Sequence, residues 1–216
     1  MKIIFFAPFY IFLSLILSSC LRLNIFIPEP DFTVYASGKT IEIGEIIERK
    51  NPARSIPQWL LTFIDGGIEE VEKLETFNDK YVFVAVNQGE NVIALNKWAD
   101  NFTAAYDFTN FAAIRIEERM ILTASLYPDD EYGLFFETFI KNAYSAEYQD
   151  AEKEETYWIK HSAPETYHFF ILLTIKKSSM QSTIRRMMAQ TNAAVAPTGS
   201  HAIAVNRLRQ NFFEGF

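Results

Sequence analysis

Apolar and polar residues alternate in several short segments, which is the pattern of β-strands with one buried face. Residues 32–36 and 40–47 show it on either side of Ser37-Gly38, a turn-forming pair, and predict a short hairpin. Residues 155–161 and 166–176 also have the composition of strands, and with the turn at residues 162–165 they predict a second antiparallel pair.

Two segments are apolar at almost every position. Tyr81 to Val86 are rich in β-branched and aromatic side chains, as in a central strand that is buried on both faces. Phe169 to Leu173 are apolar throughout, so their strand is expected near the middle of a sheet.

Apolar residues recur at every third or fourth position between these segments, which predicts amphipathic helices. The first helix is expected to begin at Ser55, because Ser55 and Gln58 form a capping-box pair, and either to bend or to pack closely at Gly66-Gly67. A long helical region is expected over residues 92–124, with a break at residues 107–110.

Three more helices are predicted in the second half of the chain. One follows Pro128 and uses Asp129 or Asp130 as its N-cap, where acidic groups also offset the helix dipole. Ser178 opens another, and a short last helix covers residues 200–213.

Together these elements predict an α+β fold. We expect helices on one face of a small, mostly antiparallel sheet, with aromatic side chains between the layers. The predicted domain covers residues 31–191, and residues 192–216 form a C-terminal linker and the short helix.

The first residues have the pattern of a secretory leader. Lys2 provides the positive charge, and an apolar run from Ile3 to Leu17 follows. A permanent membrane-spanning helix would need roughly 20 apolar residues and no cleavage site at its end. Residues 1–19 are therefore predicted to be a signal peptide.

The leader ends in Leu17-Ser18-Ser19-Cys20, which resembles a bacterial lipobox. The resemblance implies that Cys20 receives a diacylglyceryl group, that a peptidase cuts before it, and that its new amino group gains a further chain such as palmitate. Each buried methylene contributes about 0.8 kcal/mol, so two or three chains hold a protein on a membrane almost irreversibly. An ordinary secretory leader that happens to end near a cysteine is the alternative.

Residues 20–30 would then be an acylated tether, with Pro28 and Pro30 near its end. No second apolar stretch of spanning length follows. The expected location is the bacterial cell envelope, on the outer or the cytoplasmic membrane and facing the periplasm.

Composition narrows the classes of function. Removing Lys2 with the leader leaves 19 basic against 27 acidic side chains, a formal charge of −8, which argues against binding of nucleic acid. Cys20 is the single cysteine, so no intramolecular disulfide or cysteine-based metal centre can form.

Sequence motifs predict no catalytic residues, no metal site and no cofactor. His161, His168 and His201 are scattered, with no pair at helical spacing. No Gly-x-Ser-x-Gly elbow and no phosphate-binding glycine loop occurs.

Charge is distributed unevenly along the chain. Residues 129–155 hold nine acidic and two basic residues, whereas residues 176–216 hold six basic and one acidic. We favour the interpretation that the acidic and basic residues form two solvated faces of one domain. The alternative is that the basic end contacts anionic lipid or cell-wall polymer.

Several segments are similar to a family of uncharacterised spirochaete lipoproteins of the Treponema type. They are Ile56-Pro57-Gln58-Trp59, Tyr81 to Val86 with Gly89-Glu90-Asn91, Ala94-Leu95-x-x-Trp98, Tyr127 to Gly133, and Tyr167-x-Phe169-Phe170-Ile171-Leu172. The order of elements is also similar to a small outer-membrane lipoprotein domain of Helicobacter and of flagellar ring-assembly proteins. Neither resemblance implies catalytic residues.

The expected function is that of a non-enzymatic envelope lipoprotein, which is bound to the membrane through acylated Cys20 and contacts an envelope or flagellar protein. The alternative is a small-ligand carrier, or an unfamiliar enzyme, with a pocket lined by aromatic residues such as Trp59, Trp98 and Trp158.

Overall fold

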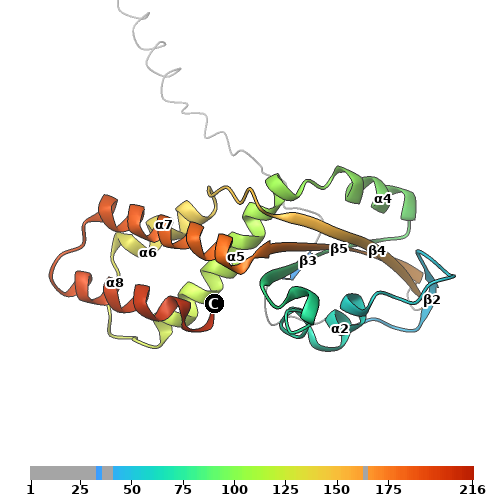
Figure 1. Ribbon diagram of the computed structural model, residues 1–216, viewed down its shortest axis with the longest axis horizontal. Coiled ribbons are helices and arrows are strands. Elements are labelled where there is room, and N and C mark those ends of the chain that lie inside the picture. Colours follow the sequence, from blue (N-terminus) through green and yellow to red (C-terminus); the bar gives the residue numbers. More distant parts are fainter. Residues whose placement is uncertain (1–32, 36–40, 163–164) are drawn as a thin grey trace, which may run out of the picture. The chain divides into compact units, whose positions relative to one another are not determined.

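A five-stranded antiparallel sheet organises the protein (Figure 1). The computed structural model describes residues 33–35, 41–162 and 165–216, which belong to one compact unit, Asp31–Phe216. The strands lie in the order β1-β3-β5-β4-β2. They are β1 (Thr33–Tyr35), β2 (Ile46–Arg49), β3 (Lys80–Gly89), β4 (Glu152–Ser162) and β5 (Glu165–Lys176). The predicted α+β class and antiparallel sheet are confirmed.

The long strands agree with the sequence. β3 and β5 carry the two apolar runs, and they pair along their whole length from Lys80 opposite Lys176 to Gly89 opposite Tyr167. β4 and β5 form the predicted antiparallel pair. β5 lies in the middle of the sheet, where its unbroken run of buried side chains is covered on both faces.

The predicted hairpin of residues 32–36 and 40–47 is wrong. β1 pairs with β3, with Thr33 opposite Val86, whereas β2 pairs with β4, with Arg49 opposite Ile159. The two short strands therefore lie at opposite edges of the sheet. Each extends a long strand that is already held by its neighbours, which is more stable than an isolated two-stranded hairpin.

Five helices and a short C-terminal turn build the larger of two cores. They are α4 (Val92–Asn101), α5 (Ala104–Ser125), α6 (Leu134–Ala143), α7 (Lys177–Val195), α8 (Gly199–Asn211) and the 3-10 turn η2 (Phe212–Gly215). Their apolar side chains pack with Phe83, Phe169 and Leu173 of the sheet. Val205, Leu208 and Phe212 belong to this core, so the C-terminal helix is part of the packed domain.

The other face of the sheet is covered by α2 (Gln58–Gly66), α3 (Ile68–Val71) and the 3-10 turn η1 (Glu75–Phe77). Leu60, Phe63 and Val71 pack there against Val84 and Leu172. Helices therefore cover both faces rather than the one face expected. Because β3 and β5 are apolar at nearly every position, leaving either face open would expose a continuous apolar surface to water.

The helix boundaries differ in detail from those predicted. α2 begins at Gln58 after Pro57, without a side-chain cap, so Ser55 does not open it. The predicted bend at the glycine pair is confirmed: Gly67 has a φ of 76°, which favours glycine, and separates α2 from α3. The long helical region breaks at Phe102 and Thr103, between α4 and α5, rather than at residues 107–110.

Two further helix starts use backbone geometry instead of the expected caps. α7 begins at Lys177, and no side chain caps it. α6 begins at Leu134 after Gly133, whose φ is 54°. By contrast, the Asn91 side chain caps α4 and accepts hydrogen bonds from the backbone N–H groups of Ile93 and Ala94.

Candidate functional site

The residues predicted to carry the lipid precede the described part of the chain. Leu17, Ser18, Ser19 and Cys20 lie there, together with the rest of the predicted leader and tether. Their roles remain predictions from the sequence. The side chains that follow are those that the structure places.

The sequence predicted that Asp129 or Asp130 caps α6, and this prediction is wrong, because no side chain caps that helix. The Asp130 carboxylate accepts two hydrogen bonds from Nη1 of Arg207 on α8, at 2.9 and 3.2 Å. Oε2 of Glu131 lies 3.3 Å from Nε2 of His201, also on α8. The turn contacts α8, and these side chains bind there while α6 begins without a side-chain cap. The acidic and basic parts of the chain therefore meet at this point.

Two of the three histidines form a buried pair. His161 on β4 and His168 on β5 stack with ring centroids 4.7 Å apart. In the ladder His161 lies opposite Thr166 and His168 opposite Ile159, so the two are diagonal neighbours on one face of the sheet. Their exposed fractions are 6% and 5%. Helical spacing in the sequence does not reveal this pair, but the register of the predicted antiparallel pair of strands brings the two histidines together.

The histidine pair has unusual hydrogen bonding. Nε2 of His168 lies 2.8 Å from Oε1 of Gln88, its direct neighbour on β3, which favours the tautomer with the proton on Nε2. Nδ1 of His168 and both ring nitrogens of His161 have no hydrogen-bond partner within the described part of the protein. Burial, followed by the electrostatic interaction with the neighbouring His161, lowers the pKa of His168 to about 4. His168 is therefore neutral at pH 7, and acid must charge a buried ring.

A metal site would need further ligands around such a pair. Among residues 33–35, 41–162 and 165–216, no group of three or more histidine, cysteine, aspartate or glutamate side chains is arranged to hold a metal ion. The third histidine, His201, lies on α8 beside Glu131.

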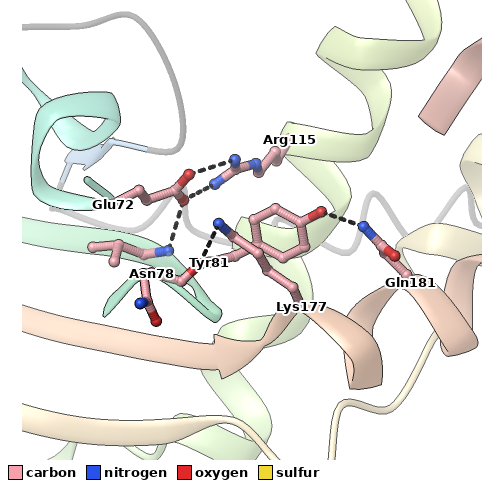
Figure 2. Close-up of polar contacts among 7 residues, drawn as sticks. Glu72, Asn78, Tyr81, Arg115, Lys177 and Gln181 are labelled. Carbon is pink, nitrogen blue, oxygen red and sulfur yellow. Dashed lines mark hydrogen bonds and ion pairs between the residues drawn. The ribbon is translucent and has the colours of Figure 1, made fainter. Parts of the chain in front are cut away.

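A second polar cluster joins the two sides of the sheet. Figure 2 shows the Arg115 guanidinium from α5 meeting the Glu72 carboxylate, which follows α3. Nη1 and Nη2 of Arg115 lie 2.6 and 3.2 Å from the two carboxylate oxygens, and the backbone N–H of Val82 donates to the same carboxylate at 2.8 Å. The guanidinium also lies 4.5 Å from the centre of the Tyr81 ring. This cluster ties α5 on one face to α3 on the other.

Tyr81 extends the cluster toward α7. Its hydroxyl accepts a hydrogen bond of 2.9 Å from Nε2 of Gln181 on α7 (Figure 2). Nζ of Lys177 donates to the backbone oxygen of Asn78 at 2.9 Å. Burial raises the pKa of Tyr81, so its hydroxyl keeps its proton at neutral pH. These contacts position helices and carry no evident reaction chemistry.

The tryptophans do not converge on one aromatic pocket. Trp59 belongs to the core of α2 and α3, whereas Trp98 and Trp158 pack against the larger core on the opposite face. Nε1 of Trp59 donates a hydrogen bond to Oε2 of Glu155 at 2.7 Å. The Trp59 side chain also lines an open groove of about 570 Å³, together with Glu154 and Phe77. Trp98 stacks edge-on with Phe169, at 6.2 Å between ring centres.

Comparison of the chain with models of known protein families, with curated proteins and with solved structures finds no match. In the part of the chain that the structure describes, none of the helices combines the length and the apolar character that crossing a bilayer requires.

Proposed function

We propose that this protein is a lipoprotein of the bacterial cell envelope, anchored in a membrane through acylated Cys20, and that it acts without catalysis by contact with another envelope or flagellar component. The observation that carries the proposal is Leu17-Ser18-Ser19-Cys20 at the end of a charged and apolar leader. The single cysteine of the chain lies where lipid attachment requires it.

The surface supports a role in contact with a partner. Leu126 at the end of α5, Leu134 at the start of α6 and Ile203 on α8 are each more than 60% exposed. Gly133 lies against His201, so the start of α6 and the N-terminal half of α8 are neighbours. Leu134 and Ile203 are thus exposed apolar side chains on neighbouring segments, a feature that is typical of interaction surfaces.

The anchor can be tested by metabolic labelling with a fatty-acid analogue in bacteria that make the full chain. We expect label on the wild type and none on Cys20→Ala. Ser19→Ala is the matched control, because it keeps a small residue before the cleavage site and should keep the label. A wild-type protein without label would overturn the proposed anchor.

The contact role can be tested in the same cells by chemical crosslinking. Wild type and Leu134→Glu would be compared, since an exposed charge at this position disturbs an apolar contact without changing the core. A defined crosslinked partner that is lost in Leu134→Glu, with the label on Cys20 intact, supports the role. An identical crosslinking pattern in both proteins would contradict a contact through this surface.

A further inference from the structure

A groove between α7 and α8 is lined by two arginines and by no acidic residue. Arg185 and Met188 from α7 face Asn206, Arg209 and Gln210 from α8, with Phe213 of the following turn. Figure 1 shows these two helices running beside each other at the C-terminal end of the chain. The groove is open and holds about 540 Å³.

The arginines of the α5, α7 and α8 region differ in their contacts. Arg115 and Arg207 pair with carboxylates, and Arg119 donates to the backbone oxygens of Phe212 and Asn211. Within the described residues, neither Arg185 nor Arg209 forms an ion pair with a carboxylate or a side-chain hydrogen bond. Both guanidinium groups therefore keep their hydrogen-bond donors available at the groove, in a protein whose formal charge is −7.

One of these guanidinium groups is held in place. The Arg185 guanidinium lies 4.1 Å from the centre of the Phe213 ring, a cation–π distance. Stacking on an aromatic ring uses the face of the planar group and leaves its N–H edge available for an anion. Phe213 in turn packs edge-on against Phe212, which is fully buried.

The donors at the groove match a phosphate group better than a carboxylate. Each guanidinium offers five N–H donors in a planar fork, and the amides of Asn206 and Gln210 offer two each. A carboxylate presents two oxygens to such a set, whereas a phosphate ester presents more, in a tetrahedral arrangement that arginine binds in a bidentate manner. Met188 and Phe213 add apolar surface for an organic group.

We propose that the groove between α7 and α8 binds a phosphate ester, with Arg185 and Arg209 as its two charged ligands. A soluble phosphate monoester and the headgroup of an anionic phospholipid share this chemistry. The inference goes beyond the membrane anchor and does not require it, because the groove lies wholly within α7, α8 and the turn after them.

Isothermal titration calorimetry of the purified full chain in detergent tests the proposal in two arms. One arm uses glycerol 1-phosphate, and the other uses dihexanoyl phosphatidylglycerol below its micelle concentration. Binding in the first arm alone identifies a soluble ester, and binding in the second identifies a lipid headgroup. Either result supports the groove if it depends on both arginines, and no binding in either arm overturns the proposal.

Dependence on the arginines is measured with Arg185→Gln and Arg209→Gln. Each is expected to weaken binding about tenfold, because a charge-assisted bidentate contact is removed. Arg54→Gln is the charge-matched control. Arg54 is exposed, and it precedes α2, so it is not part of the groove. An equal loss in Arg54→Gln would show non-specific charge attraction and would contradict the site.

Arg209→Lys distinguishes weaker binding caused by disturbed packing from weaker binding caused by the loss of the guanidinium contact. This variant keeps the charge and the helix but lacks the bidentate fork, so circular dichroism should be unchanged while affinity falls several-fold. Full affinity in Arg209→Lys would leave only a general charge effect and would overturn the assigned geometry.

Discussion

The two faces of the sheet are covered in different ways. On one face, α4 to α8 bury a large core that is rich in phenylalanine and methionine and continues between the helices. On the other, α2 and α3 close a smaller core, in which Val82, Val84 and Val86 meet a few larger side chains. The smaller face also carries the histidine pair near the end of β4, whereas the Trp59 groove lies toward the start of that strand.

This difference suggests a division of roles. The large core draws on five helices and should set the global stability of the domain. The smaller core is closed by short elements, and its face carries the buried His168, whose pKa is lowered to about 4. Substitutions in each core and at the link between the two faces test that division.

Leu172 and Leu173 allow a direct comparison of the two cores, because they are consecutive residues of β5 that face opposite sides. Leu173→Ala should lower the free energy of unfolding by about 3–5 kcal/mol. Leu172→Ala should cost less, about 2–3 kcal/mol, because Leu172 lines the Trp59 groove and water can fill the space. Urea denaturation measures both. Equal losses would show that the two cores respond alike.

The histidine pair should make stability depend on pH. Burial lowers the pKa of His168 to about 4, whereas an unfolded histidine has a pKa of about 6.5. Between these two pH values the unfolded chain therefore binds more protons than the folded one. Stability is therefore complete above about pH 6.5 and falls by about 1.4 kcal/mol per pH unit toward pH 4.

Urea denaturation at pH 7.5 and pH 5 in wild type and His168→Asn isolates this effect from the titration of carboxylates, which both proteins share. The wild type should lose about 2 kcal/mol more than the variant over this interval. His201→Asn is the control, because His201 is partly exposed and lies on α8. A His168→Asn protein with the same pH dependence as the wild type would rule out the buried pair as the cause.

The link between the faces is tested by Arg115→Met, which leaves the Glu72 carboxylate with the Val82 N–H as its remaining described partner. The two side chains are 15% and 13% exposed, so we expect a loss of about 2 kcal/mol, less than for a fully buried pair. Thermal unfolding measures it. Lys73→Met removes an exposed pair with Glu70 and should have no measurable effect.

The smallest expected effect concerns the cap of α4 over the larger core. Asn91→Ala removes acceptors for two backbone N–H groups and should cost about 1 kcal/mol. Hydrogen exchange should show faster exchange in the first turn of α4 alone. Asn101→Ala, at the exposed last residue of the same helix, is the control and should change stability by less than about 0.5 kcal/mol. Faster exchange throughout the core would contradict a local effect.

Much of the fold was present in local patterns of the sequence. The apolar runs of β3 and β5 identified the central strands, because only a strand covered on both faces tolerates apolar side chains at successive positions. The Gly66-Gly67 break between α2 and α3 was visible as well, since glycine reaches the positive φ that the turn needs. These features depend on a few neighbouring residues.

Other features were decided only by the tertiary structure. β1 and β2 are too short to specify a partner, so the free edges of the long strands determined where each one pairs. The same apolar runs that identified the central strands required cover on both faces, and only packing showed which helices supply it. Asp130 lies beside a helix start, but the approach of Arg207 from α8 gave it a different partner.

The candidate sites show the same division. The lipobox at Cys20 is a linear motif, and the sequence alone predicts it. The contacts of His161 with His168, and the shared groove of Arg185 and Arg209, join residues from different strands or helices. Such groupings depend on strand register and helix packing, which are set by the burial of the whole chain. A pattern of neighbouring residues reports what should be buried, and only the folded structure determines what it is buried against.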